Sequence, residues 1–595
     1  MITKTLFKSS GILFLFLTIA TLFSCNKELS NENGGSKVIL TNDFTTTTTS
    51  SVSGFVTDEN KIPLTGAIVE FAGSNIITDK YGYFEFSSME VIQNTAVVKV
   101  AMPGYFTLIK TFIATKNKSS FFRIKLSPKK MVGSINSNTG GSVTVANNLT
   151  LTIPADGVID KVTGIKYSGI INIAALWIDP TSNELQNIMP GDLRGIDSSG
   201  NVNHLTSYGM ATVELTGTAG QHLQLAAGKK AILNGKIPSA IIGNSPLTIP
   251  LWYFDEEKGL WKEEGTAVKN GSSYIGEVSH FSSWNYDVPA KCVILSGSFI
   301  SLKGLPVRNA LVKISSVTNP NTSSLVYTDA FGYIRVAVPE NSALKLEILG
   351  ESNCNTAIFS KLITTTKDHL SLGIIDINAW AEMSFVTGSV TDCNNSPVSN
   401  GYIIMTKDNL LYRFPLAEDG WFKFTSIVCN GSANISLIAE NSATQQQSYS
   451  ALYTLKAGDN SINSLIACGL STKEFVHYII DGIPGAFDTP ADTIWQPPSN
   501  YFHTVGRRKL PVVENFSATF DTVGIHLGSA QKLIGCSGTL LPGPSIVPSP
   551  VMVHITEFGK IGEFVSGNFS GNIQYVNLPN TIFHVDFNFR VKRTQ

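Results

Sequence analysis

Three segments of the chain repeat one pattern of residues at fixed spacing. Each begins with an apolar, strand-like run around a glycine, at Gly54, Gly297 and Gly388. Nine residues later each copy has a proline, and four residues further on a small residue opens a second β-rich run. The prolines are Pro63, Pro306 and Pro397, and the small residues are Ala67, Ala310 and Gly401. Recurrence of both offsets predicts three copies of one structural unit.

Each copy continues with a turn and then with alternating aromatic or branched residues, at residues 78–84, 328–334 and 417–422. Aspartate bonds backbone donors two residues further on, and glycine supplies a positive φ without a steric penalty. The alternation that follows places one face of a strand against a core. These segments therefore predict β-hairpins. A calcium loop is the alternative, but the Asp-x-Asp-x-Asp series that it requires is absent.

The repeated residues resemble the carboxypeptidase regulatory-like domain, a transthyretin-like β-sandwich of seven strands. The first copy matches best, with Gly54, Pro63-Leu64, Gly66-Ala67 and the turn at residues 78–84 in place, whereas the third has Asp419 directly before its glycine. The resemblance implies three sandwiches, at residues 52–128, 291–378 and 384–469. It also implies a non-catalytic spacer role.

A different segment, residues 131–289, lies between the first two copies. Residues 140–143 (GGSV) and 149–157 (LTLTIPADG) resemble the opening of a ZU5-type β-sandwich, and strands are expected at residues 170–178 and 212–215. Residues 251–261 then predict an aromatic hairpin around an acidic turn. Packing across the two strands is one explanation for its rings. The alternative is that Trp252, Tyr253 or Trp261 stacks against a sugar, and exposure of these rings would decide it.

The C-terminal part, residues 471–595, ends in a strand-like segment of period two. Phe583, Val585, Phe587, Phe589 and Val591 alternate with polar residues, which is typical of a half-buried antiparallel strand. His584 and Asp586 share the polar face of that strand. They suit either a solvated face or two members of a metal or catalytic site.

Composition supports an all-β fold of tandem antiparallel β-sandwiches. Charged residues make up 15% of the chain, 50 of its 595 residues are glycine, and long helix-forming stretches are nearly absent. The formal net charge of -1 gives no electrostatic reason to expect nucleic acid as a partner.

The N-terminus predicts export and lipid attachment. Lys4 and Lys8 precede an apolar run at residues 11–23 that ends at Ser24-Cys25. The run is shorter than the roughly 20 residues that span a membrane. Residues 22–25 (LFSC) resemble the bacterial lipoprotein box, which implies a signal peptide at residues 1–24 and lipid on Cys25; a plain secretory signal is the alternative.

The segment after the signal predicts a flexible tether at residues 25–51. It is polar and contains a run of five threonines without an apolar period. Residues 26–28 (NKE) partly resemble the signal that sends lipoproteins of Bacteroidetes-type bacteria to the cell surface. We therefore expect an outer-membrane, lipid-anchored protein on the cell surface.

The six remaining cysteines form an even set, for which disulfides are the default in an oxidising compartment. Cys393 and Cys429 fall inside the third copy and are predicted to pair, which leaves Cys354 and Cys468 as a flanking pair. A zinc site is the competing reading, but Cys-x-x-Cys and His-x-x-x-His spacings are absent. No metal or cofactor is expected.

Catalytic motifs are absent from the sequence, including the Gly-x-Ser-x-Gly elbow, the His-Glu-x-x-His helix and the Walker loop. Asp192, Asp197 and Glu214 could still be paired by folding into a glycosidase-like site. The sequence favours a non-catalytic lipoprotein that presents a string of sandwiches to an unknown protein or glycan. A carbohydrate-binding protein and, less favoured, a glycan or peptide hydrolase are the alternatives.

Overall fold

The structure is a computed structural model, and it describes residues 43–350, 357–379, 382–468, 470–471, 474–489, 492–496, 502–508, 514–526, 528–539, 545–547, 550–559, 564–575 and 578–593. Strands dominate these residues and most neighbouring strands run antiparallel, so the all-β prediction is confirmed. No helix in the described ranges is long and apolar enough to cross a membrane.

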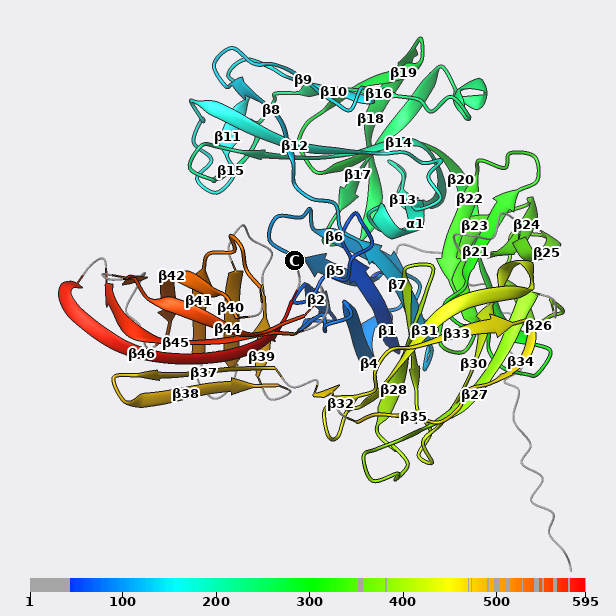
Figure 1. The fold of residues 1–595 in the computed structure, drawn as a ribbon. Helices are drawn as coiled ribbons and strands as arrows, with labels where there is room; N and C mark the ends of the chain where they lie inside the picture. Colours follow the sequence, from blue (N-terminus) through cyan, green and yellow to red (C-terminus); the bar gives the residue numbers. More distant parts are fainter. Residues whose placement is uncertain are drawn as a thin grey trace, which may run out of the picture. The chain divides into compact units, whose positions relative to one another are not determined.

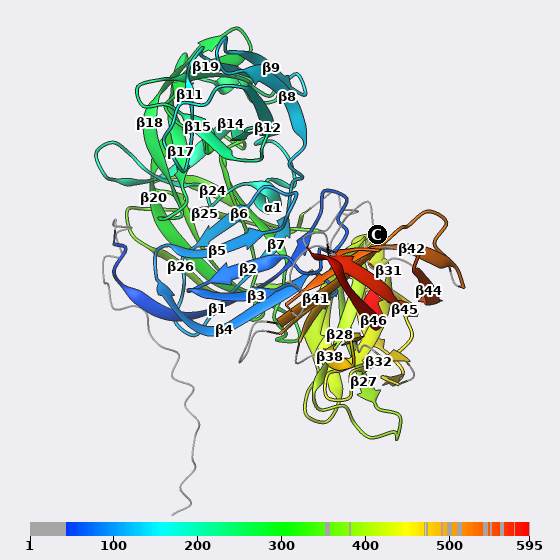
Figure 2. The same cartoon turned by 90° about the vertical axis from the view of Figure 1, so that its left-hand side faces the viewer.

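The first copy is a sandwich of two sheets, ordered β4-β1-β7 and β3-β2-β5-β6 (Figure 2). Alternation places Val69, Phe84 and Val98 in the core between the sheets, each at most 1% exposed. Its strands are β1 (Thr47–Thr57), β2 (Ile68–Phe71), β3 (Ser74–Ile77), β4 (Tyr83–Ile92), β5 (Ala96–Ala101), β6 (Leu108–Phe112) and β7 (Ser119–Lys125).

Strand β1 begins inside the segment that was predicted to be a tether. Its register with β4 starts at Thr47 opposite Ile92, and Ser50 is 1% exposed. The prediction that the tether extends to Ser51 is therefore wrong by five residues, because pairing with β4 recruits the threonine run into the sheet.

The second and third copies reproduce the topology of the first. In each, the first strand pairs antiparallel with the hairpin strand that follows the turn and parallel with a strand near the end of the copy. The second copy contains the end of β20 (Ser283–Ser301) and β21 (Leu311–Ser316), β22 (Ser323–Tyr327), β23 (Tyr333–Pro339), β24 (Ala343–Leu349), β25 (Ala357–Thr364) and β26 (Leu370–Ile377). The third contains β27 (Met383–Thr391), β28 (Gly401–Lys407), β29 (Leu410–Pro415), β30 (Trp421–Ile427), η3 (Cys429–Gly431), β31 (Ser432–Asn441), β32 (Gln446–Gln447), β33 (Ala451–Lys456), β34 (Gly458–Ser461) and β35 (Leu465–Ile466).

The repeated residues have the same structural task in every copy. The prolines at 63, 306 and 397 each bridge back to the end of the first strand. The turn glycine of the first copy, Gly82, has φ 70°, and a Cβ built on it would lie 2.3 Å from the Val56 carbonyl oxygen. Gly332 and Gly420 lie equally close to the first strand of their own copies. Only glycine fits this turn without displacing the backbone.

The turn of the third copy differs from the other two in the position of its aspartate, and the hydrogen bonds show the consequence. The Oδ1 atom of Asp79 accepts hydrogen bonds from the Tyr81 and Tyr83 amides, and Asp329 does the same for residues 331 and 333. In the third copy Ala417 occupies this position, so Asp419 accepts only the Trp421 amide.

The segment between the first two copies forms a separate β domain. Ile170–Ile178 is strand β12, and residues 212–215 lie in β14, as expected. The aromatic hairpin is also present, with Asp255 opposite Leu260. Its elements are β8 (Met131–Asn136), β9 (Gly141–Val145), β10 (Leu149–Ile153), β11 (Val158–Asp160), β12, α1 (Leu185–Ile188), β13 (Arg194–Ile196), β14 (Val202–Thr216), β15 (His222–Leu225), β16 (Ala231–Lys236), η1 (Ile242–Asn244), β17 (Thr248–Asp255), β18 (Leu260–Asn270), β19 (Ser273–Val278) and the start of β20.

Strand β20 joins this inserted domain to the second copy without a linker. Up to Lys291 its residues pair with β14 or β17, and from Cys292 onward they pair with β23 and β26. The predicted domain boundary near residue 290 is therefore the point at which one continuous strand changes partners.

The C-terminal domain forms a sheet ordered β38-β37-β46-β45-β44-β42-β41-β40-β39, in which β45 and β46 are long and curved (Figure 1). Val585, Phe587, Phe589 and Val591 of β46 are buried, as the period of two predicted. Its strands are β37 (Phe475–Ile480), β38 (Ile483–Asp488), β39 (Thr493–Trp495), β40 (Phe502–Arg508), β41 (Glu514–Phe520), β42 (Ala530–Gly538), β43 (Ser545–Ile546), β44 (Met552–Phe558), β45 (Phe564–Tyr575) and β46 (Leu578–Lys592). The short strand β36 (Leu470–Ser471) pairs with β32 and so extends the sheet of the third copy.

Candidate functional site

The two tryptophans of the aromatic hairpin are buried. Trp252 and Trp261 are each 0% exposed, and their indole nitrogens donate to the carbonyl oxygens of Asp287 and Asp192 at 3.2 and 3.1 Å. Of the two explanations, packing therefore holds for both tryptophans and the sugar-stacking alternative is wrong for them, because cross-strand and interdomain packing covers both rings. Tyr253 is half-buried and lies edge-on to His280, with ring centroids 4.7 Å apart, so its ligand role remains a prediction.

The disulfide of the third copy differs from the predicted one. Cys393 is bonded to Cys468 and not to Cys429, so both predicted pairs are wrong. The bond joins the end of the first strand to the end of the copy, which the parallel pairing of β27 with β35 brings together. Cys429 is also disulfide-bonded. Cys25, the predicted lipid acceptor, lies outside the described residues.

The acids proposed for a glycosidase-like pair have separate partners. Asp192 pairs with Arg194 at 2.7 Å, Glu214 pairs with Lys129 at 2.8 Å, and Asp197 accepts a hydrogen bond from the Asn203 amide at 2.9 Å. Burial raises the pKa of Asp192. No ion pair or hydrogen bond joins two of these acids in the described part of the chain.

His584 and Asp586 lie on the solvent face of β46. Their Nε2 and Oδ1 atoms are 3.5 Å apart, and both side chains are about half exposed, at 51% and 50%. His584 also contacts Ser570 and Asn572 of the neighbouring strand β45. Within the described ranges, no group of three or more His, Cys, Asp or Glu side chains could hold a metal ion.

Buried polar and apolar contacts lie at the junctions between domains. Lys110 of the first copy is 0% exposed, and its Nζ donates to the carbonyl oxygens of Gln186 and Met189 of the inserted domain, both at 2.9 Å. Burial lowers the pKa of Lys110 to about 7. A buried apolar cluster surrounds this contact and contains Ile109 of the first copy together with Trp252 and Trp261.

A second shared cluster joins all three copies. It contains Phe55 and Phe121 of the first copy, Tyr327 of the second, and Tyr402 of the third. The guanidinium of Arg123 lies 4.6 Å from the Tyr412 ring centroid, and its Nη1 donates to the Leu411 carbonyl oxygen at 3.0 Å. Aromatic and cation–π contacts of this kind hold the first copy against the third.

An ion pair lies beside this cluster. Lys80 of the first copy is 2.6 Å from Glu440 of the third, and their side chains are only 10% and 9% exposed. Burial raises the pKa of Tyr402, so its hydroxyl stays protonated and donates to Glu440 at 2.6 Å. A carboxylate with both partners in place tolerates burial, whereas loss of either partner would leave it uncompensated.

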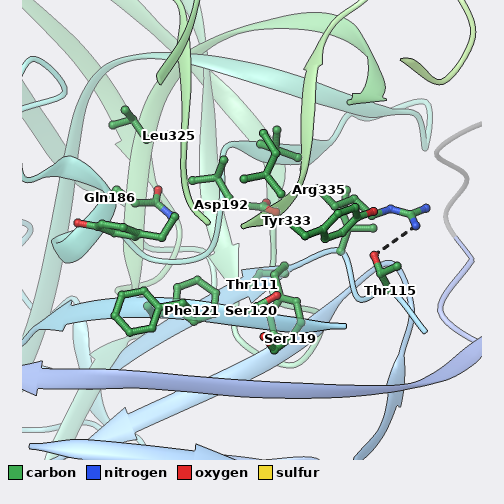
Figure 3. A pocket seen from close by; sticks show the side chains of 17 residues that line it. Thr111, Thr115, Ser119, Ser120, Phe121, Gln186, Asp192, Leu325, Tyr333 and Arg335 are labelled. Atoms are coloured by element: carbon green, nitrogen blue, oxygen red, sulfur yellow. Dashed lines mark hydrogen bonds between the residues drawn. The ribbon is translucent and has the colours of Figure 1, made fainter. Parts of the chain in front are cut away.

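A small cavity of about 50 Å³ with a mixed polar and apolar lining lies between strands of the first two copies and α1 (Figure 3). Arg335 and Thr115 on its wall contact one another at 3.4 Å, and the Gln186 carbonyl oxygen Oε1 and Arg335 Nε are buried without a partner in the described ranges. This volume suits a few water molecules. It is far below the roughly 300–1,000 Å³ of small-molecule pockets.

A larger cavity, of about 720 Å³, has walls from all three copies and the inserted domain. The charged side chains of its wall are Lys61, Arg123, Lys125, Lys313, Glu184 and Glu347. Glu184 is held by Lys61 at 2.9 Å and by Lys125 at 3.1 Å. Sequence reasoning missed this cavity, because its residues come from segments far apart in the chain and carry no shared motif.

Comparison with known proteins matches only part of the chain. No family model matches it. Cartilage intermediate layer protein 2 is 32% identical over 123 residues in Homo sapiens and 28% identical over 131 residues in Mus musculus. These matches cover 21% and 22% of this chain, and 10% and 11% of the curated relatives, so the chain covers about a tenth of their length.

The solved structures with some likeness include two pilins and one other bacterial protein. The Streptococcal ancillary pilin has a TM-score of 0.13 and 10% identity, covering 38% of this chain and 95% of the pilin. The shaft pilin SpaA from Lactobacillus rhamnosus GG has a TM-score of 0.17 and 9% identity, covering 30% of this chain and 97% of the pilin. The Bacillus anthracis TIE protein has a TM-score of 0.13 and 8% identity, covering 64% of this chain and 70% of the TIE protein. At these TM-scores the likenesses carry no argument about function.

Proposed function

We propose that this chain is a non-catalytic, lipid-anchored protein of the bacterial cell surface, in which packed β-sandwiches form a platform for binding or adhesion. The observation that carries the proposal is the sharing of buried clusters among the three copies and the inserted domain. A platform of this kind positions a binding surface at low cost in conformational entropy.

The sandwiches of the predicted string pack against one another. Met383, Phe385 and Ile427 of the third copy belong to the buried core of the second copy, and Ile113 of the first copy packs with Ile294 and Ala337 of the second. With β20 running through two domains, residues 47–468 have no free linker in their described parts. As a spacer, the packed copies would therefore act as one body with fixed geometry.

The N-terminal sequence and the disulfide support placement outside the cytoplasm. Residues 22–25 resemble a lipoprotein box, and Cys393–Cys468 suits an oxidising compartment. Display on the outer surface of the outer membrane is the more specific part of the proposal, and residues 26–28 support it.

The test is protease accessibility on intact cells, comparing the wild type with Cys25→Ser and following the C-terminal domain. The proposal expects digestion of the wild-type protein before lysis and release of Cys25→Ser from the membrane fraction. Protection of the wild type until lysis would contradict surface display. A Cys25→Ser protein that keeps its membrane and detergent partitioning would contradict the lipid anchor.

A further inference from the structure

We propose that the 720 Å³ cavity between the three copies and the inserted domain binds an acidic oligosaccharide, a sugar chain with carboxylate groups. The inference rests on the proposed binding function and names its ligand class. It is independent of the aromatic hairpin, whose tryptophans are buried elsewhere.

The size and walls of the cavity favour an extended ligand. Its volume falls within the range of roughly 300–1,000 Å³ that is typical of ligand sites, and such sites occur preferentially between domains. The wall comes from both ends of the first copy, the loop at residues 180–184 with α1, the β21–β22 hairpin, and Leu410 of the third copy. A shape defined by four domains stays formed only while the domains remain packed.

Charge on the wall is predominantly positive. Four cationic side chains and two carboxylates line it, an excess of two positive charges. Both carboxylates already have cationic partners, because Lys345 holds Glu347 at 2.6 Å and two lysines hold Glu184. Lys313 of β21 is half-buried on the wall and has no carboxylate within 4.0 Å in the described part of the chain. A ligand carboxylate would form a charge-assisted hydrogen bond with the Lys313 ammonium.

Neutral polar groups on the same wall match hydroxyl groups. Asn183 and Asn321 are exposed and Asn309 is half-buried, and in the described ranges their side chains make no hydrogen bond. A carboxamide both donates and accepts, as a sugar hydroxyl does, so these residues suit a polyhydroxylated ligand. Half-buried leucines beside them, at 311, 325, 349 and 410, offer apolar surface to the C–H faces of sugar rings.

Arg123 also lines the cavity, and its contacts hold it in place. It is 8% exposed, and its guanidinium is held by the rings of Phe55, Phe121 and Tyr412. It adds positive potential without having to move, whereas Lys313 supplies the mobile ammonium.

Titration calorimetry of the detergent-purified full chain with tetragalacturonate tests the inference. We expect saturable binding that weakens as salt is added, and loss of at least about tenfold in affinity in Lys313→Gln and Asn321→Ala. The methyl-esterified tetramer, which lacks the charges, should bind at least about tenfold more weakly. Lys229→Gln, an exposed lysine outside the cavity, is the matched control and should bind as the wild type does.

Failure to bind tetragalacturonate, or equal binding by Lys313→Gln and the wild type, would overturn the site. Tighter binding of tetraglutamate than of the sugar would overturn the ligand class in favour of an acidic peptide. Unchanged thermal midpoints show that the variants remain folded. A chain that is displayed on intact cells but does not bind the sugar rejects this inference alone, because protease accessibility reports on the proposed surface function separately.

Discussion

The three copies and the C-terminal domain bury their apolar faces in different ways. In residues 47–468, buried clusters cross from one domain to the next. In the C-terminal domain, every member of the buried cluster lies between Val476 and Val591. One contact between this domain and the first copy is made by a charged group, the Lys592 ammonium, which lies 4.9 Å from the Tyr81 ring centroid. Shared apolar cores couple folding, whereas polar contacts at a boundary do so weakly, so we expect one cooperative body and one separate domain.

The largest expected effect comes from the cluster between the first copy and the inserted domain. Trp252→Ala should cost about 3–5 kcal/mol, because it removes a fully buried ring and leaves a cavity. Urea unfolding followed by hydrogen exchange should show the midpoints of both domains falling together. Phe589→Ala in the C-terminal core is the matched change, and it should lower only the midpoint of that domain. If Trp252→Ala lowered the midpoint of the inserted domain alone, it would contradict the claim that this domain and the first copy unfold together.

Removal of the third copy's disulfide should have the next largest effect. The bond closes a separation of 75 residues, so the double change Cys393→Ser and Cys468→Ser should cost about 2–4 kcal/mol. Since residues of the third copy belong to the core of the second, the second copy should lose stability as well. Comparison of urea midpoints in oxidised wild type and the double variant provides the measurement. A second copy with an unchanged midpoint would show that the shared core does not couple them.

The third effect depends on pH, and at pH 4 it is comparable in size to that of the disulfide. His204 is 1% exposed, its Nε2 lies 2.9 Å from Ser324 Oγ of the second copy, and burial lowers its pKa to about 4 from an ordinary 6.5. Because the folded chain favours the neutral ring, stability is present above pH 6.5 and is lost as pH falls towards 4, by about 3 kcal/mol at pH 4. His204→Gln should lose less stability over this window than the wild type does. The His222→Gln variant, changed at an exposed histidine, should show the same dependence of stability on pH as the wild type. If the His204→Gln curve also runs parallel to the wild-type curve, the role of His204 is contradicted.

Local units of this fold could be predicted from the sequence, and their assembly could not. Gly82 and Asp79 act within one turn, so their spacing carries the information. Lys110 and Gln186, by contrast, lie 76 residues apart and meet only in the folded chain. The disulfide of Cys393 was mispredicted for a similar reason, since spacing does not reveal that β27 and β35 run side by side. Trp252 fits a packed hairpin and a stacking platform equally well in sequence, and only its burial separates the two.

Hydrogen exchange of the wild-type full chain over a urea series tests the central claim most directly. The account predicts one common midpoint for peptides from β1, β14, β21 and β28, which represent the three copies and the inserted domain, and a different midpoint for peptides from β41 and β46. Four separate midpoints among the first group would contradict it, because the sandwiches would then unfold as independent units on a string.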